Sequence, residues 1–290
     1  MEATEAPKRS QVWQTIGLLL PAGIVVIVFL LVPLFIVLLY SFFDRDAYGG
    51  IVPAFTLKNY QSLFQPIYFP IFLNSFQIAI YTTIICLLVG YPVAYFIAFR
   101  AKRFAPLLLL LLIIPFWTNF LARMSAWIAL LNRNGLINSL LLMSNLVDEP
   151  LKLLNTYGAV LVGLLYAFLP SAVFPIYAAL ESIDRSLLEA AQDLGANPLR
   201  TFKEITFPLS LPGLVAATLF VFVPSIGVYV IPALLGGGKE IMIGNLIVML
   251  YLEFRNIPFG SAVAIVLLLI VLAGLVLYMR ALRTVEEKRS

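Results

Sequence analysis

Histidine is absent from this chain of 290 residues, and cysteine occurs once, as Cys86. Histidine is the commonest metal ligand and a frequent general base, so zinc, haem and Ser-His-Asp chemistry are not expected. One cysteine cannot form a disulfide within the chain. We therefore predict no catalytic residue, no metal site and no cofactor in this chain, and we expect it not to be an enzyme.

Charged residues are also scarce, at 12% of the chain against 62% for apolar residues, and the mean hydropathy is +1.00. Soluble domains carry about 25% charged residues, so most of this chain is expected to lie in lipid. A transmembrane helix needs about 20 apolar residues, and the apolar segments are too long and too little alternating for a membrane β-barrel. The prediction is an all-α integral membrane protein with six transmembrane helices, at Ile16–Phe42, Ile71–Phe99, Ala105–Leu131, Tyr157–Leu180, Leu211–Leu235 and Phe259–Leu282.

The first apolar segment follows Lys8 and Arg9, as the core of a signal peptide would. It is about 25 residues long, against about 7–15 for a signal core, and no cleavage site of small residues follows it. We therefore expect a cytoplasmic N-terminus (1–15), a retained first transmembrane helix (16–42), a core domain (71–282) and a cytoplasmic tail (283–290).

Lysine and arginine are distributed unevenly between the two sides of the membrane. With the N-terminus in the cytoplasm, the cytoplasmic segments hold twelve of these residues and the outer loops hold six. The positive-inside rule therefore favours both termini in the cytoplasm. Because the positive residues are scattered over loop ends and form no single patch, no nucleic-acid partner is expected.

The middles of the predicted spans contain no Asp, Glu, Lys or His, and Arg123 is the one ionisable residue well inside a span. A proton-driven secondary carrier normally needs a titratable relay there, so this class of transporter is less expected. The chain has no ATP site of its own, because Gly236–Lys239 is followed by Glu240 where a P-loop needs Ser or Thr. We expect this glycine-rich stretch to be a flexible outer loop.

The most polar segment, Glu181–Pro208, lies between the fourth and fifth spans on the predicted cytoplasmic side. Asp184 is a good N-cap for a first helix, and Gly195 is placed to end that helix in the left-handed conformation. Asn197 can cap a second helix, with a proline at its first position. The sequence therefore predicts two short helices and a tight turn along the membrane surface, with Pro208 at the turn into the next span. Such a unit can insert a helix into a groove on another protein.

Within this segment, EAAQDLGANPLRTFKEITFP resembles the cytoplasmic signature of binding-protein-dependent ABC importer permeases. The signature reads Glu-Ala-Ala, three residues, Gly, nine residues and Ile-x-Leu-Pro, and the chain matches it at Glu189–Ala191, Gly195 and Ile205–Pro208, with Phe207 for leucine. The resemblance implies that this loop docks into a cleft on an ATPase subunit. The implied coupling residues are Asp184, Leu187, Glu189, Ala190, Ala191, Asp193, Leu194, Gly195, Ile205 and Pro208.

Among these residues, the resemblance implies that Glu189 is a polar contact to the ATPase. Ala190 and Ala191 would permit close approach, and Gly195 would make the turn. The plain alternative is that 181–208 is only a polar loop between two spans.

The resemblance also implies a fold and an assembly. The fold would be a type I ABC importer permease, with five core helices after an N-terminal span and with 181–208 as its coupling loop. The assembly would contain a second homologous permease, two ATPase subunits that bind ATP and Mg, and a periplasmic or extracellular binding protein. It would lie in the cytoplasmic (inner) membrane of a bacterium, surrounded by lipid.

Further stretches resemble the B-type permease of spermidine/putrescine importers, namely GYPVAYFIA (90–98), PFWTNFLARMSAW (115–127), NGLIN (134–138), LLGGGKEIMIGNLI (234–247) and FRNIPFGSA (254–262). This resemblance implies import of a polyamine delivered by the binding protein. Related permeases for opines, thiamine or ferric iron share parts of the pattern and remain alternatives.

A polyamine is a flexible polycation, and each aromatic face attracts an ammonium group by about 0.5–2 kcal/mol. The candidate residues for the substrate path are Tyr91, Tyr95, Trp117, Asn119, Ser225 and Tyr229. For any one of them, packing or interfacial anchoring is the ordinary alternative. Arg123 fits poorly in a cation path, and we expect it to pair with an acidic group on the sister permease or the binding protein.

Overall fold

The computed structural model describes residues 20–21, 23–46 and 48–287. The chain forms two compact units, one of Met1–Phe64 with Met249–Ile270, and one of Gln65–Val248 with Val271–Ser290. The predicted cytoplasmic N-terminus, 1–15, and the beginning of the predicted first span lie outside the described residues.

Six stretches of the described chain are long and apolar enough to cross a membrane. Five are single helices, at Gly23–Ser41, Phe69–Arg100, Tyr157–Glu181, Pro198–Gly227 and Ile257–Val276. The sixth is a helix pair, Lys102–Trp117 and Phe120–Met143, bent by 92°. The predicted all-α membrane fold is confirmed, with five candidate spans in the described chain, or six if the bent pair counts as one span.

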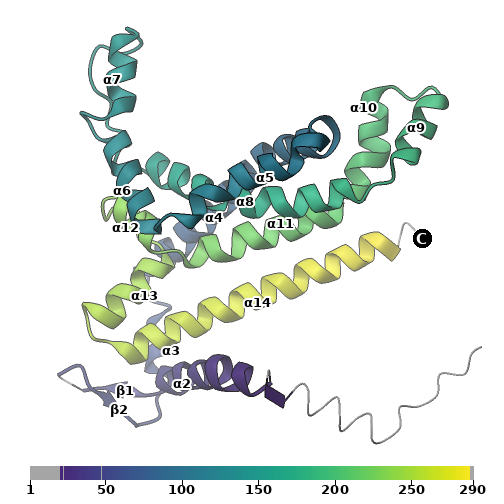
Figure 1. The fold of residues 1–290 in the computed structure, drawn as a ribbon. Coiled ribbons are helices and arrows are strands. Elements are labelled where there is room, and N and C mark those ends of the chain that lie inside the picture. Colours follow the sequence, from purple (N-terminus) through teal and green to yellow (C-terminus); the bar gives the residue numbers. More distant parts are fainter. Residues whose placement is uncertain (1–19, 22, 47, 288–290) are drawn as a thin grey trace, which may run out of the picture. The chain divides into compact units, whose positions relative to one another are not determined.

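The first unit contains the N-terminal span and a small hairpin (Figure 1). Its elements are the π-helix η1 (Ile27–Leu31), α2 (Val32–Ser41), β1 (Asp44–Arg45), β2 (Ile51–Val52), α3 (Lys58–Ser62), the end of α13 (Ile243–Leu252) and the first part of α14 (Ile257–Glu287). The strands pair antiparallel, with Asp44 opposite Val52 and Arg45 opposite Ile51. Arg45 Nη2 donates to the Phe254 carbonyl at 2.7 Å, which fixes the hairpin to the segment between α13 and α14.

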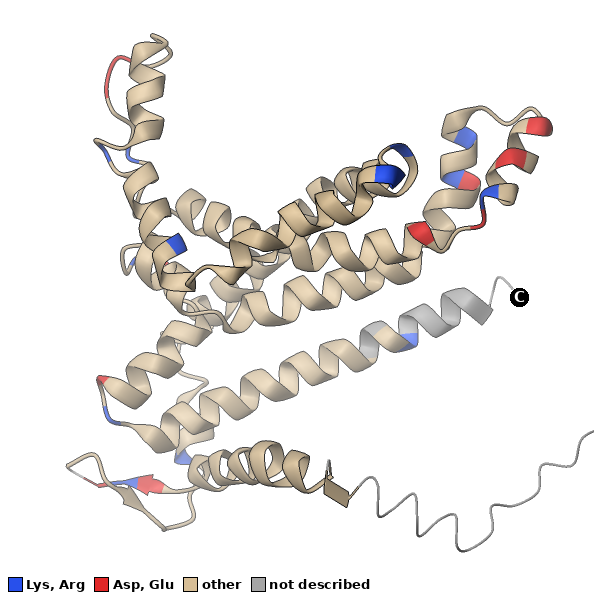
Figure 2. Cartoon of the chain, in the orientation of Figure 1, with Lys and Arg blue, Asp and Glu red and all other residues tan. Residues whose placement is uncertain are grey.

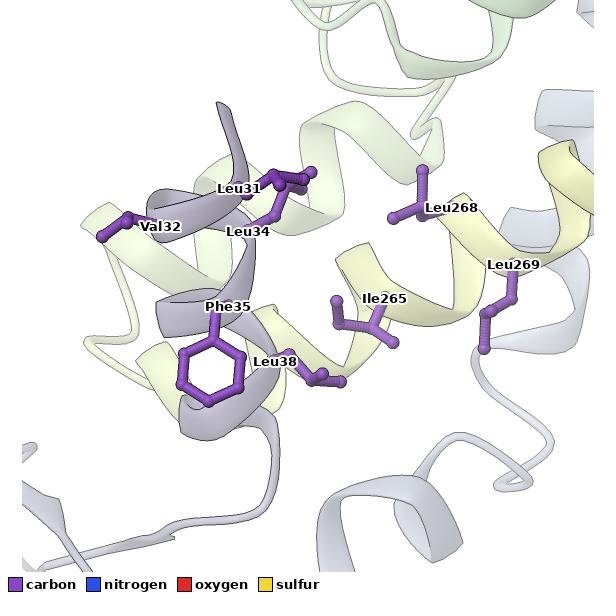
Figure 3. Close-up of a pocket in the computed structure, with 8 residues that line it drawn as sticks. All are labelled: Leu31, Val32, Leu34, Phe35, Leu38, Ile265, Leu268 and Leu269. Carbon is purple, nitrogen blue, oxygen red and sulfur yellow. The ribbon is translucent and has the colours of Figure 1, made fainter. Parts of the chain in front are cut away.

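Apolar side chains line a groove between α2 and α14 in this unit (Figure 3). The lining residues are Leu31, Val32, Leu34, Phe35, Leu38, Ile265, Leu268 and Leu269. The N-terminal span buries none of its most apolar stretch against the described chain. A helix that is apolar on all sides suits contact with lipid or with another membrane helix.

The second unit contains the remaining spans and the coupling loop (Figure 1). In chain order its elements are α4 (Phe69–Tyr95), η2 (Phe96–Arg100), η3 (Lys102–Phe104), α5 (Ala105–Ile113), η4 (Ile114–Trp117), α6 (Phe120–Leu131), α7 (Leu136–Met143), α8 (Tyr157–Glu181), α9 (Arg185–Asp193), α10 (Pro198–Thr201), η5 (Phe202–Thr206), α11 (Phe207–Gly227) and α12 (Val230–Leu235), with parts of α13 and α14. Here η2 and η5 are π-helices, whereas η3 and η4 are 3₁₀-helices. Helices α4, α8 and α11 pack on one another and form the centre of the unit.

Small residues let these three helices approach closely. A Cβ atom added to Gly213 of α11 would lie 2.5 Å from Ala179 Cβ and 2.6 Å from the Pro175 carbonyl oxygen of α8. A Cβ atom added to Gly90 of α4 would lie 3.3 Å from Ala172 Cβ, also on α8. Close packing at small residues is the usual way in which membrane helices associate, because lipid provides no hydrophobic force between them.

The third span is broken, which corrects the single helix predicted at Ala105–Leu131. Pro115 lies in η4 and has no N–H to donate to the preceding turn, which favours the end of the first helix. The chain is then extended at Thr118, with φ −81° and ψ 156°. Asn119 caps the new helix α6, because its Oδ1 accepts a hydrogen bond from Leu121 N at 2.8 Å.

The fifth span differs from the prediction at both ends. The sequence predicts Leu211–Leu235 with a turn at Pro208, but one continuous helix runs from Pro198 to Gly227. The predicted turn at Pro208 is wrong because this residue lies in the first turn of α11, directly after π-helix η5. The wider π-turn relieves the clash between a proline ring and the preceding turn, so the helix continues. At the other end, Val228 is extended and the span breaks there.

The glycine-rich stretch Gly236–Lys239 forms a packed turn, where the sequence predicts a flexible loop. A Cβ atom on Gly236 would lie 2.6 Å from the Pro232 carbonyl oxygen, and one on Gly237 would lie 2.5 Å from the Asn155 side chain. Gly237 and Gly238 have φ values of +60° and +74°, which favour glycine. These glycines are therefore explained by close packing and backbone conformation.

Candidate functional site

Charged residues of the second unit gather at its two ends, while the middles of α4, α8 and α11 carry none (Figure 2). One end holds α9, α10 and η5, which form most of the segment 181–208, called here the coupling loop. This distribution is the one expected of helices that cross a bilayer with both ends in water. The coupling loop is therefore part of the polar end of this unit.

The first helix of the coupling loop begins as the sequence predicts. Asp184 is the N-cap of α9, and its Oδ1 accepts a hydrogen bond from Ser186 N at 3.0 Å. This backbone N–H, with the Ser186 hydroxyl as a second partner, lowers the pKa of the Asp184 carboxyl below its ordinary value. The cap satisfies one of the free N–H groups at the helix start.

The turn after α9 depends on Gly195. Its φ is +81°, in the left-handed region that side chains disfavour. Ala196 N donates to the Ala191 carbonyl and Gly195 N donates to the Gln192 carbonyl, both at 2.9 Å. These two bonds define a Schellman motif, which satisfies the last carbonyls of the helix. A Cβ atom on Gly195 would meet nothing within 4 Å, so the need for glycine within this chain is conformational.

The second helix of the coupling loop is the beginning of a much longer one. Asn197 Oδ1 accepts from Arg200 N at 2.8 Å and so caps α10, with Pro198 in its first turn. Arg200 Nε pairs with Glu204 Oε1 at 3.0 Å on the exposed surface. Because α10, η5 and α11 are continuous, the second helix of the coupling loop and the fifth span form one helix.

Helix α9 buries one face against its own chain and leaves the other open. Ile183 and Ala191 are buried, and Leu188 packs on the same apolar cluster. On the open side Leu194 is 88% exposed, and Leu187, Ala190 and Leu199 are exposed too. The acidic residues Glu189 and Asp193 of α9 are exposed too. Clustered exposed leucines of this kind indicate a partner surface.

The coupling residues predicted from the sequence therefore fall into two groups. Those on the open surface are Asp184, Leu187, Glu189, Ala190, Asp193, Leu194 and Gly195. The others, Ala191, Ile205 and Pro208, are buried or half-buried and serve the packing of the loop on its own chain. Of the two alanines predicted to permit close approach, Ala190 alone is accessible to a partner.

Tyr91 and Tyr95, predicted for the substrate path, lie at the base of the coupling loop. The ring of Phe202 in η5 stacks edge-on against both tyrosines, at centroid distances of 5.8 Å and 6.0 Å. The Tyr91 hydroxyl lies 2.9 Å from Ser210 Oγ at the start of α11. These contacts attach α4 to the coupling loop, a role that the sequence prediction missed.

The other predicted path residues lie elsewhere in the second unit. Trp117 is 79% exposed beside the break of the third span, where Asn119 caps α6. Ser225 is fully buried and donates to the Val221 carbonyl of its own helix at 2.6 Å, and Tyr229 is half-exposed at the break of the fifth span. The six residues thus form no single cluster, and their place on a substrate path stays a prediction.

Arg123 lies in an aromatic cage. Its guanidinium carbon is 4.6 Å from the ring centroid of Phe116, 5.6 Å from that of Phe120 and 5.9 Å from that of Tyr166. Its Nε and Nη1 atoms are buried and have no hydrogen-bond partner in the described chain. Aromatic faces stabilise a cation in such a site. The predicted pairing with an acidic group of another subunit stays a prediction.

A second set of residues surrounds the break of the fifth span. Asn245 Nδ2 donates to the Tyr229 carbonyl at 2.8 Å, and Ser75 Oγ accepts from Ile243 N at 2.8 Å. Asn74 Nδ2 donates to the Ile241 carbonyl at 3.2 Å. The signal available in the sequence was the polar Gly-Asn pair within an apolar stretch at 241–249.

Metal binding has no basis in the described residues, because no three Asp, Glu, His or Cys side chains in them could hold an ion together.

Comparison with known proteins gives consistent matches. Residues 90–290 match the family described as "Binding-protein-dependent transport system inner membrane component". The chain is 40% identical over 262 residues to the spermidine/putrescine transport system permease protein PotB of Escherichia coli strain K12, which covers 90% of this chain and 95% of that protein. PotB of Haemophilus influenzae is also 40% identical over 262 residues, covering 90% and 92%.

The fold also resembles that of a solved structure. A chain in the crystal structure of a bacterial alginate ABC transporter, in complex with an alginate pentasaccharide-bound periplasmic protein, matches with a TM-score of 0.79. The match covers 95% of this chain and 96% of that chain at 17% sequence identity. At this identity the likeness concerns the fold alone.

Proposed function

Because this chain belongs to the family of binding-protein-dependent transport system inner membrane components and is an ABC importer permease subunit, we propose that it carries a polyamine such as spermidine or putrescine. The observation that supports this substrate is the 40% identity to PotB proteins over at least 90% of the chain. The alternative substrates predicted from the sequence are an opine, thiamine or ferric iron.

The coupling loop is the docking element for an ATPase subunit in this proposal. Its open surface combines exposed leucines with the carboxylates of Glu189 and Asp193, and a short helix of this kind fits a groove on a partner. Each permease would hold one of two ATPase subunits, and ATP with Mg would bind there. A second homologous permease and an outer binding protein complete the assembly. Both termini lie in the cytoplasm, as the charge bias of the loops favours.

Transport then follows from a two-state movement. Closure of the ATPase dimer on ATP displaces α9 and α10, and the continuous helix through η5 carries this displacement into α11. The rings of Tyr91, Tyr95 and Phe202 carry part of it into α4. The spans tilt between outward and inward openings, and the chain itself makes or breaks no covalent bond.

Substrate selectivity belongs to the binding protein in this scheme. The described residues of the spans present aromatic and neutral polar groups, with no carboxylate in the middles of α4, α8 and α11. Weak, distributed attraction of a polycation by aromatic faces suits a transporter, because tight binding would slow release. The permease therefore needs only a path that tolerates a flexible cation.

The direct test is purification of the complete importer and its reconstitution into vesicles. We expect the binding protein to bind spermidine or putrescine, and the vesicles to accumulate that polyamine only when ATP is supplied. Opines, thiamine and ferric iron serve as the competing ligands. Preferred binding of one of these would contradict the polyamine assignment, and accumulation without ATP would contradict an ATP-driven importer.

A further inference from the structure

The break of the fifth span at Val228–Tyr229 is held by the beginning of α13. Asn245 Nδ2 donates to the Tyr229 carbonyl at 2.8 Å. A Cβ atom on Gly244 would lie 2.4 Å from the Gly227 carbonyl oxygen and 2.8 Å from that of Val228. A side chain at position 244 would therefore force α13 away from the break. The Gly-Asn pair fits the unwound backbone closely, with one residue supplying space and the other a hydrogen bond.

The same segment is attached to the far end of α4. Ser75 Oγ accepts a hydrogen bond from Ile243 N at 2.8 Å and donates to the Ile71 carbonyl at 2.8 Å. Both Ser75 and Ile243 are fully buried. The Ile243 N–H stands at the start of α13, where no carbonyl of its own helix is available to it. Ser75 is therefore the acceptor that this buried donor requires.

Helix α4 is attached to the coupling loop at its opposite end. Tyr91 bonds Ser210 and packs on Phe202, as described above. Ser75 and Tyr91 are sixteen residues apart in an unbroken helix, a length of about 24 Å at 1.5 Å per residue. Helix α11 covers a similar distance from the coupling loop to Gly227. Helices α4 and α11 therefore both connect the coupling loop to the region of the break, and α13 joins their far ends.

We propose that the two bonds Ser75–Ile243 and Asn245–Tyr229 form a latch, which is closed or open depending on the relative position of α4 and α11. While the latch is closed, the break at Val228–Tyr229 is fixed. When the coupling loop moves α11 along α4, the latch opens and the end of the fifth span changes conformation. Ser75 and Asn245 are thus positioning residues that join ATP-driven movement to opening of the far end. The inference rests on the proposed function as an ATP-driven importer.

The test uses the complete importer in vesicles, with ATP hydrolysis measured with and without the loaded binding protein, and uptake measured alongside. Ser75→Ala removes the acceptor for Ile243 N, whereas Ser75→Thr keeps a hydroxyl there. Thr83→Ala is the matched control, because Thr83 is a buried hydroxyl residue of α4 that donates to the Ala79 carbonyl of its own helix.

We expect Ser75→Ala to raise hydrolysis in the absence of binding protein and to lower the solute imported per ATP, each by about threefold to tenfold. Ser75→Thr should restore both values, and Thr83→Ala should leave both unchanged. Asn245→Ala should act in the same direction as Ser75→Ala. The double variant should be no worse than the stronger single variant, because both changes open one latch.

A parallel fall in uptake and hydrolysis, with solute per ATP unchanged in Ser75→Ala and Asn245→Ala, would overturn the latch and leave the bonds with a structural role only. If the Ser75→Ala complex does not assemble, the solute imported per ATP by the Asn245→Ala complex provides the same test. The unaltered complex tests the substrate assignment separately from the latch. If this complex imports no polyamine but its ATP hydrolysis is still stimulated by the binding protein, the substrate assignment fails. The latch is then tested by the ratio of hydrolysis with binding protein to hydrolysis without it, compared between the unaltered complex and the variants.

Discussion

The hydroxyl oxygens of Tyr91 and Ser210 lie 2.9 Å apart and join α4 to the first turn of α11. Ser210 already donates its hydroxyl proton to the Phe207 carbonyl at 2.9 Å, so Tyr91 is the donor in the pair. The ring of Tyr91 also packs on Phe202 and Phe207. The coupling loop is therefore attached to a second span as well as to the one that it continues.

Tyr91→Phe should destabilise the protein only slightly. It removes one hydrogen bond, with a net contribution of about 0.5–1.5 kcal/mol, and leaves Ser210 bonded to Phe207. Tyr91→Ala also removes the contacts with Phe202 and should lower the thermal midpoint of the purified complex considerably more. Equal midpoints for the two variants would show that the ring contacts contribute nothing.

Gly195→Ala should loosen the turn of the coupling loop without a steric clash. An L-residue in the left-handed region costs about 1–2 kcal/mol, and the new Cβ points into open space. Hydrogen exchange at the amides of residues 194–196 should therefore be faster than in the parent protein. Unchanged exchange would contradict the structural role given to this glycine.

Gly195→Asp adds a charged side chain to the docking surface. We expect normal insertion into the membrane but loss of transport, because the side chain projects where the ATPase subunit docks. The membrane-bound amount of protein and the uptake rate are measured in the same cells. Normal binding-protein-stimulated uptake would contradict the docking assignment.

Glu189→Lys should separate ATP hydrolysis from transport. Glu189 is exposed and forms no ion pair with the described residues, so reversal of its charge should change stability by less than about 0.5 kcal/mol. Uptake per ATP should fall strongly, and Glu189→Gln, which keeps the shape and loses the charge, should have a smaller effect. If Glu189→Lys shows the same uptake per ATP as the parent protein, Glu189 is not part of the interface with the ATPase.

The N-cap of α9 should respond to acid. The pKa of Asp184 is lowered in the folded loop, so its carboxylate contributes stability above its ordinary pKa and loses it as the pH falls through the folded pKa. Hydrogen exchange at Ser186 and its neighbours should therefore accelerate relative to the intrinsic rate only below about pH 4. Asp184→Asn retains the cap without titrating and should abolish that pH dependence. Persistence of the dependence in Asp184→Asn would assign it to another group.

Two glycines of α11 form a matched pair. A Cβ atom on Gly213 would overlap Ala179 Cβ and the backbone of α8, whereas one on Gly227 would meet nothing within 4 Å. Gly213→Ala should destabilise the protein by about 1–3 kcal/mol through overpacking, and Gly227→Ala should be far milder. Thermal unfolding of the purified complex measures both. Equal effects would contradict the close approach of α8 and α11.

The coupling loop was predictable because its signals are local. A capping residue at Asp184, a helical run and Gly195 lie within twelve residues, and each acts on its immediate neighbours. The six apolar spans were predictable for a related reason, because lipid requires long apolar helices. The continuation of the helix through Pro208 was not, since it depends on the π-turn before this proline.

The contacts at the break of the fifth span could not be found from sequence reasoning. Ser75 and Ile243 are 168 positions apart, and their hydrogen bond depends on how the folded chain places the start of α13 beside α4. The tyrosines of α4 were assigned to the substrate path because an aromatic residue in a span suits a cation as well as it suits packing. Their contacts with Phe202 depend on the position of η5 beside α4, which a sequence pattern does not specify.

The most direct measurement concerns the tip of the coupling loop. Leu194→Cys introduces a thiol at an exposed position, and the natural Cys86 is buried and far less reactive. In membranes that contain the complete importer, a short bifunctional reagent should link this thiol to the ATPase subunit, and binding of ATP should change the yield. A thiol that is labelled by soluble reagents but never linked to an ATPase subunit would contradict the account.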